Sequence, residues 1–303
     1  MTRLASWTTR IACALALTTM TAGAAAGTYV GSRAYRFESR MFSPSRGAMP
    51  KPAELAAAAD VSIPTPDGLM VRGWFVPSHN GRAVVLVHGS SGTRADVTRE
   101  AGALVRAGYG VLALDMPGHG ESDGKVTWGL ADQAAVSAGV DFLAAQPSVD
   151  PDAIGAYGFS FGSAVVALAA ARDSRIRAVA LAGAFSSGEE QVENEVGQWG
   201  PLSRIPGLFA AERGGLAIDH LRTTDAIKGL GSRPVLFVAG DKDVAVPLWM
   251  TESLYARVTG PKELLVVPGA QHGGYAPSGG AQYLGQLTDF FDRTLTGGRV
   301  SHS

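Results

Sequence analysis

The segment "AIGAYGFSFGSAVVALAAA" (Ala153–Ala171) places one serine between a predicted strand and a predicted helix. Its first half is an apolar run typical of a buried strand, and its second half is rich in small helix-forming residues. Ser160 lies at the centre of Gly-Phe-Ser-Phe-Gly, which matches the G-x-S-x-G pattern of a nucleophile turn. We therefore predict that Ser160 is a nucleophile. Gly158 and Gly162 are expected to be glycines because side chains there would clash across the turn.

A second match to the same pattern, "GESDG" at Gly120–Gly124, contains Ser122. It lies several residues beyond its predicted strand, and no helix follows it directly. Glu121 and Asp123 flank the serine, and two carboxylates would repel the oxyanion that a serine nucleophile generates. We interpret Ser122 as a residue of a solvated, glycine-rich turn.

The remainder of the chain alternates apolar strand-like runs with helical segments. A hairpin is predicted around Pro66-Asp67-Gly68, and a final helix at about 281–295. This alternation predicts an α/β fold with a mostly parallel central sheet and helices on both faces. The stretch 186–222 interrupts the alternation as a longer segment inserted before the strand-like run 234–240.

A serine nucleophile needs a base, and the base needs an orienting carboxylate. On this kind of sheet the order along the chain is serine, then aspartate or glutamate, then histidine. His272 follows an apolar run at the end where sites form in open α/β sheets, so it is the predicted base. Asp241 and Asp243 both follow the run 234–240, and spacing alone does not choose between them.

Five segments together resemble the α/β-hydrolase superfamily, in particular its serine-aminopeptidase-like and BEM46-like members. The segments are "HGSSGTR" (His88–Arg94), "DMPGHGESDG" (Asp115–Gly124), "GFSFG" (Gly158–Gly162), "GDKDVAVP" (Gly240–Pro247) and "GAQHGGY" (Gly269–Tyr275), and the resemblance covers about residues 60–295. It implies that Asp243 is the acid, with Asp241 as the fallback. It also implies an oxyanion hole formed by the backbone N–H groups of Ser90 and Phe161. The insertion at 186–222 lies where members of the superfamily carry a cap, so the resemblance implies a short cap there. His88 is expected to be structural.

These observations predict a serine hydrolase that cleaves a carboxylic ester or thioester through an acyl-enzyme intermediate. Amide or peptide cleavage is the alternative, and a non-catalytic binding protein on the same fold is a further one. The predicted partner is a small-molecule acyl substrate. Trp199 and Phe209, both in the 186–222 stretch, are candidates for lining an apolar substrate entrance.

Composition and motifs argue against other classes. Lys and Arg number 26 against 27 Asp and Glu, so net charge gives no argument for nucleic-acid binding. One cysteine and scattered histidines provide no metal-ligand spacing, and no cofactor is expected. "GFSFGS" does not match G-x-G-x-x-G, and no Walker A sequence is present. A haloalkane-dehalogenase-type reaction would need a carboxylate in place of Ser160.

The N-terminal segment is predicted to be a targeting segment that is not part of the folded domain. Arg3 and Arg10 precede the uncharged stretch Ile11–Val30, whose length suits a single membrane anchor. We predict an anchor at 1–32, membrane contact through this segment alone and a location in the cell membrane. The alternative is a signal peptide cleaved near 22–26, followed by secretion. A linker is predicted at 33–54, the hydrolase domain at 55–298 and a tail at 299–303. The oligomeric state is not indicated.

Overall fold

The architecture is a single mixed sheet with helices on both faces, seen in a computed structural model that describes residues 7, 17–32, 35–36, 44–197 and 200–296. Within these residues, eight strands lie in the order β1-β2-β4-β3-β5-β6-β7-β8. Their bounds are β1 Ala59–Pro64, β2 Met70–Val76, β3 Gly81–Val87, β4 Gly110–Leu114, β5 Val149–Phe159, β6 Ile176–Ala182, β7 Val235–Gly240 and β8 Lys262–Val267. The β1–β2 and β2–β4 pairs are antiparallel and the other pairs are parallel, which confirms the predicted fold class.

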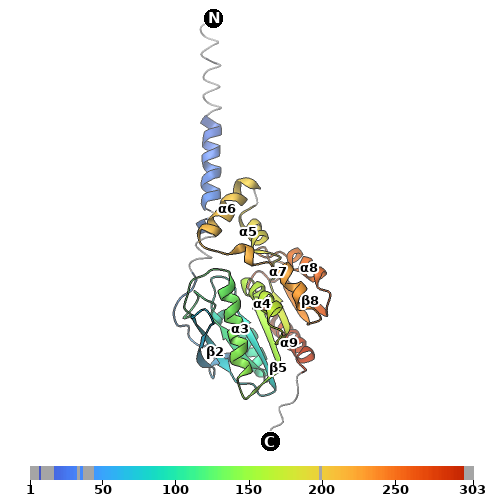
Figure 1. Cartoon of the computed structure of the whole chain (residues 1–303). Coiled ribbons are helices and arrows are strands. Elements are labelled where there is room, and N and C mark those ends of the chain that lie inside the picture. The colour runs from blue at the N-terminus through green and yellow to red at the C-terminus, as the bar shows by residue number, and fades with distance from the viewer. Residues whose placement is uncertain (1–6, 8–16, 33–34, 37–43, 198–199, 297–303) are drawn as a thin grey trace.

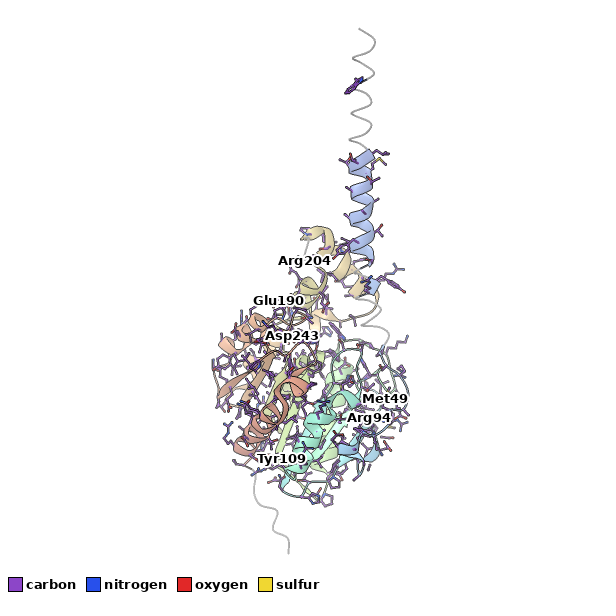
Figure 2. The ribbon with its side chains drawn as sticks, turned by 180° about the vertical axis from the view of Figure 1, so that it is seen from behind. Met49, Arg94, Tyr109, Glu190, Arg204 and Asp243 are labelled. Atoms are coloured by element: carbon purple, nitrogen blue, oxygen red, sulfur yellow. The ribbon has the colours of Figure 1, made fainter. Side chains whose placement is uncertain are left out.

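Helices cover the two faces of the sheet. Buried residues of α3 (Leu130–Ala144), α4 (Phe161–Arg172) and α8 (Leu248–Arg257) join the core cluster on one face. Buried residues of α2 (Thr98–Arg106) and α9 (Tyr275–Thr294) join the cluster on the other. Figure 1 looks onto the face covered by α3 and α4, and Figure 2 looks onto the opposite face. Burial on both faces explains why the parallel strands read as continuous apolar runs.

Short elements complete the chain. They are η1 Ala53–Leu55, η2 Arg94–Val97, η3 Ile218–His220, α7 Thr223–Ala226 and η4 Ile227–Leu230. The predicted hairpin is confirmed, because β1 and β2 pair across the turn at Pro66-Asp67-Gly68. The final helix begins earlier than predicted, at Tyr275. Gly280 interrupts it with a φ of 51°, so the predicted start near residue 281 is the resumption of the helix after this kink.

The interruption at 186–222 contains two helices, α5 (Gly188–Val196) and α6 (Pro201–Arg213), followed by η3. Figure 1 shows α5 and α6 as a layer of their own at one end of the sheet domain. In Figure 2, Asp243 lies at this same end, just below Glu190 of α5. The insertion therefore covers the end of the sheet where the predicted site residues were expected.

The predicted N-terminal membrane anchor is wrong. Residues 17–32 are helical, but among the residues that the structure describes no helix is both long and apolar enough to span a bilayer. The first part of the predicted stretch, residues 11–16, lies outside the described residues. The predicted location in the cell membrane depended on this anchor, so that prediction is wrong as well. The basic start that supported the signal-peptide alternative, with Arg3 and Arg10, lies outside the described residues.

Candidate active site

Ser160 occupies a crowded turn between β5 and α4. Its backbone has a φ of 53° and a ψ of −119°, a conformation that residues other than glycine rarely adopt. A Cβ atom at Gly158 would lie 2.2 Å from the carbonyl oxygen of Gly162, and one at Gly162 would lie 2.5 Å from that of His88. Both distances are far below van der Waals contact. The two glycines therefore let the turn close and hold the serine hydroxyl out from the sheet.

A chain of two hydrogen bonds joins Ser160, His272 and Asp243. Ser160 Oγ lies 2.9 Å from His272 Nε2, and His272 Nδ1 lies 2.8 Å from Asp243 Oδ2. Because a carboxylate only accepts, the imidazole proton belongs on Nδ1, which leaves Nε2 to accept the serine proton. Asp241 does not take part: it is exposed and accepts the Gly269 amide at 2.6 Å. The structure thus brings Asp243, and not Asp241, to the histidine.

The Asp243 carboxylate accepts four hydrogen bonds. The amides of Ala245 and Val246 donate to Oδ1 at 3.0 and 2.8 Å. The hydroxyl of Tyr275 donates to Oδ2 at 2.6 Å, beside the bond from His272. Burial by itself raises the pKa of Asp243, but the hydrogen bonds and the His272 charge outweigh it and leave that pKa below its ordinary value. Asp243 therefore stays ionised beside the histidine.

Sequence reasoning gave no role to Tyr275. Its side chain is 2% exposed at the first position of α9, three residues after His272. The only signal in the sequence was its place at the end of "GAQHGGY". A hydroxyl that donates to the predicted acid could not be inferred from that spacing, because it depends on how the first turn of α9 packs beside the loop after β7.

The two amides predicted to hold an oxyanion border the same space. Ser90 and Phe161 both line the cavity at Ser160, and among the described residues neither backbone N–H has a protein acceptor. Phe161 is the first residue of α4, so its N–H lies at the positive end of the helix dipole. Negative charge that develops beside Ser160 would meet both donors and this dipole.

A buried ion pair fixes the segment that follows Ser90. The Arg94 guanidinium lies 3.0 Å from Asp115 Oδ2, and the Arg94 amide donates to Asp115 Oδ1 at 2.7 Å. Both side chains are almost fully buried. His88 supports the same region: its Nε2 accepts the Met116 amide at 3.0 Å, and its Nδ1 lies 2.7 Å from the Gly89 carbonyl. Burial lowers the pKa of His88 to about 4, so the ring is neutral at pH 7.

Ser122, the serine of the second pattern match, is a structural residue but not a solvated one. Its side chain is fully buried; the hydroxyl donates to the Asp115 carbonyl at 2.7 Å and accepts the Arg72 amide at 2.8 Å. The expectation of a solvated turn was wrong because this loop folds back onto β2. With both of these bonds made, Ser122 ties the loop to the sheet.

The cavity at Ser160 has a volume of about 160 Å³. Its walls combine aromatic and polar side chains. The aromatic ones are Trp128, Phe159, Phe161 and Phe185, and the polar ones include Ser90, Ser91, and Gln191 and Glu195 of α5. The rings of Trp128 and Phe161 stack at 5.5 Å between centroids. Phe209 does not line this cavity, because it is 63% exposed on α6. Trp199 lies outside the described residues. In the described part of the chain, no three His, Cys, Asp or Glu side chains form a group suited to a metal ion.

The model of the prolyl oligopeptidase family matches residues 96–298. The chain belongs to this family. The match confirms the predicted resemblance to the α/β-hydrolase superfamily, and it includes Ser160, Asp243 and His272, whereas Ser90 precedes it. The matched range covers the chain from η2 to beyond the end of α9.

Individual proteins show the same relationship. The uncharacterized protein Rv2307c of Mycobacterium tuberculosis is 34% identical over 242 residues, covering 77% of this chain and 79% of its own length. Among solved structures, the esterase Pf2001 of Pyrococcus furiosus is similar with a TM-score of 0.71 and 22% identity, over 84% of this chain and 98% of the esterase. Est1E of Butyrivibrio proteoclasticus, solved with ferulic acid bound, has a TM-score of 0.63 and 22% identity, over 78% and 99%. At this identity the two structures show a shared fold alone.

Proposed function

We propose that this member of the prolyl oligopeptidase family is a serine hydrolase that cleaves carboxylic esters, or thioesters, with small acyl groups. The observation that carries the proposal is the continuous hydrogen-bonded chain from Ser160 through His272 to Asp243, at 2.9 and 2.8 Å. This chain has the geometry that activates a serine hydroxyl: a nucleophile, a base within hydrogen-bond reach and a carboxylate that orients the base.

The proposed reaction proceeds in two halves. His272 Nε2 takes the Ser160 proton as Oγ bonds to the acyl carbon, and the oxyanion that forms accepts from the Ser90 and Phe161 amides. The tetrahedral intermediate collapses, the bond to the leaving oxygen or sulfur breaks, and His272 returns the proton to that atom. Water then attacks the acyl-enzyme by the same route, which releases the acid and restores Ser160. Asp243 holds the imidazole and stabilises its charged form.

The size of the cavity supports a small acyl group. A cavity of about 150 Å³ holds one benzene ring, and the cavity at Ser160 measures about 160 Å³. The aromatic side chains in its walls suit an apolar acyl chain of that bulk. A longer chain has to displace a ring or extend into solvent, so its transition state gains little further binding energy.

Peptide or amide cleavage is the second candidate, and the family assignment favours it. The same three side chains serve either reaction, because an amide also proceeds through an acyl-enzyme and a tetrahedral intermediate. The two candidates differ in the leaving group that His272 has to protonate. They are therefore separated by substrates and not by the arrangement of Ser160, Asp243 and His272.

A substrate panel tests the proposal. The full chain is assayed with p-nitrophenyl acetate, butyrate and octanoate, and with aminoacyl p-nitroanilides. We expect kcat/KM to be highest for the acetate or butyrate and at least tenfold lower for the octanoate, since one badly accommodated methylene costs about 1–3 kcal/mol. Ser160→Ala should lose this activity, and Ser232→Ala, an exposed serine in a loop, should keep it. Faster cleavage of the anilides would favour the peptidase; no turnover of any substrate would favour a binding protein.

A further inference from the structure

A second cavity, of about 270 Å³, adjoins the cavity at Ser160. The two share Gly89, Ser90 and Phe159 as lining residues. The Phe159 ring lies between them: it packs against His272 at 4.9 Å between centroids and against Tyr275 at 5.8 Å. Gly273 and Tyr275, the residues just after His272, line only the second cavity. It therefore lies beside the oxyanion loop, on the side from which α9 starts.

Glu100 of α2 is the buried ionisable group of this second cavity. It is 6% exposed and lines the cavity, and no described Lys, Arg or His forms an ion pair with it. Its Oε1 accepts the Tyr283 hydroxyl at 3.1 Å and the Tyr157 hydroxyl at 3.4 Å. Burial raises the pKa of Glu100, while its own backbone N–H, the two tyrosine hydroxyls and the charge of Arg99 act to lower it. A buried carboxyl without an ion-pair partner is costly.

The remaining walls add attraction for a cation. Asp96 contributes a second carboxylate at the rim, while its Oδ2 accepts the Thr93 amide at 3.0 Å. Tyr157, Phe159 and Tyr275 contribute aromatic rings, whose faces attract cations. Among the described residues that line the cavity, none is Lys, Arg or His. A cavity lined by carboxylates and aromatic rings favours a ligand that carries a positive charge.

We propose that the Glu100 cavity binds an alkylammonium group carried by the leaving group of the substrate. This inference rests on the proposed hydrolase function, because it treats the cavity as an extension of the cleft at Ser160. The leaving group is favoured over the acyl group because Gly273, the residue next to His272, lines this cavity, and the Phe159 ring that separates the two cavities packs against His272, which returns a proton to the leaving atom. The acyl group then occupies the aromatic cavity under α5. A cation beside the Glu100 carboxylate supplies an ion-pair partner, which this group lacks among the described residues.

A binding experiment tests the cavity without any catalysis. Ser160→Ala, as the full chain, is titrated by calorimetry with choline and with 3,3-dimethylbutan-1-ol, which has the same shape and no charge. We expect choline to bind at least tenfold more tightly. Adding Glu100→Gln, which keeps the size of the side chain, should abolish the difference. Glu252→Gln makes the same change on the exposed face of α8 and should preserve it.

Equal affinity of the two alcohols, or a choline preference that survives Glu100→Gln, overturns the proposal. Circular dichroism and thermal unfolding establish that the Glu100→Gln protein is folded. If it is not, the comparison of the two alcohols in Ser160→Ala decides the question by itself.

A kinetic experiment separates this inference from the proposed function. Wild type is assayed with acetylcholine and with 3,3-dimethylbutyl acetate, which carry the same acetyl group. We expect kcat/KM to be at least tenfold higher for the cationic ester, and the ratio to fall toward one in Glu100→Gln. Equal kcat/KM values for the two esters contradict the cation site but remain consistent with the proposed esterase. If neither ester is hydrolysed and the p-nitrophenyl esters are not turned over either, the esterase is contradicted, and the choline titration still decides the cation site.

Discussion

The hydroxyl of Tyr275 donates a 2.6 Å hydrogen bond to Oδ2 of Asp243, the same oxygen that lies 2.8 Å from His272 Nδ1. The tyrosine is almost fully buried, and its ring packs edge-on against Phe159, which in turn contacts His272. Tyr275 therefore fixes the carboxylate that orients the histidine, and it does so without touching the serine. It is a positioning residue for the proposed reaction.

Tyr275→Phe should lower kcat about tenfold with little change in KM, because a charge-assisted hydrogen bond is worth about 1.5–3 kcal/mol and only part of it is felt at the histidine. Loss of the donor also raises the pKa of Asp243. A carboxylate with one donor fewer stabilises the protonated, inactive form of the His272–Asp243 pair more strongly, so the acid limb of the kcat/KM profile should move to higher pH. Steady-state kinetics from pH 4 to 9 measure both effects.

Tyr109→Phe is the matched control for this change. Tyr109 is also buried and also donates to an aspartate, Asp292, at 2.7 Å, but it lies away from the three proposed catalytic residues. Its removal should leave the pH profile in place. A Tyr275→Phe enzyme with an unshifted acid limb and kcat within twofold of wild type would show that the tyrosine only fills space.

The two aspartates after β7 should differ sharply. Asp243→Asn should lower kcat by about 10³–10⁴-fold, the size of effect seen when a triad acid loses its charge and the histidine takes the wrong tautomer. Asp241→Asn removes only an acceptor for the Gly269 amide and should stay within a few-fold of wild type. The same ester assay reads both variants. A larger loss in Asp241→Asn would transfer the acid role to that residue.

Gly158→Ala tests the crowded turn. The added methyl would lie 2.2 Å from the Gly162 carbonyl oxygen, and backbone of that kind cannot move aside without displacing Ser160. We expect a loss of about 1–3 kcal/mol in the free energy of unfolding, together with loss of ester hydrolysis. Denaturant titration measures the first and the ester assay the second.

Gly285→Ala provides the comparison, because no atom lies within 4 Å of a Cβ at this exposed position of α9. Alanine there should stabilise the protein by up to about 1 kcal/mol through its higher helix propensity. If Gly158→Ala is as stable and as active as Gly285→Ala, the turn is not crowded in the way described.

Asp132 should make stability fall as pH rises. Its carboxylate accepts the Gly129 amide at 2.8 Å and is buried, and burial raises its pKa from 3.8 to about 7. Between these values the folded state binds more protons than the unfolded state, so the stability contributed by Asp132 is complete below about pH 4 and is lost as pH rises through 7. Asp132→Asn removes this titration and keeps an acceptor for the Gly129 amide.

Thermal unfolding of both proteins from pH 5 to 8 isolates the effect. The melting temperature of Asp132→Asn relative to wild type should increase with pH. Burial lowers the pKa values of His88 and His119 to about 4 and about 3. Both histidines are present in both proteins, so their contributions to the pH dependence cancel in the difference between the two melting temperatures. A difference that is independent of pH would mean that Asp132 is already ionised in the folded protein at pH 5.

Much of the fold could be predicted because strands buried on both faces are continuous apolar runs, and because turns carry Gly and Pro. The order of Ser160, Asp243 and His272 along the chain, each just after a strand, likewise indicated that the three side chains would meet at one edge of the sheet. Contacts between distant segments could not be predicted in this way. The burial of Ser122 depends on its loop folding back onto β2. The Tyr283 hydroxyl on Glu100 depends on α9 packing beside α2.

The cap marks a second limit. Phe209 was a candidate for the substrate entrance because it is an apolar residue of the insertion that lies where members of the superfamily carry a cap. In the structure it is 63% exposed, and α5 instead contributes Gln191 and Glu195 to the cavity. The apolar residues of α6 gave no periodic signal that would distinguish its covered face from its exposed face, so the sequence could not show which helix of the insertion faces Ser160.

The central claim is that Ser160 is an activated nucleophile. A fluorophosphonate probe, which bonds to the Oγ of activated serines, is added to the folded wild-type protein, and the labelled peptide is identified by mass spectrometry. We predict stoichiometric labelling on Ser160, none on Ser122, and loss of labelling in Ser160→Ala and after heat denaturation. Labelling that persists in a folded Ser160→Ala protein, or that never forms on folded wild type, would contradict the account.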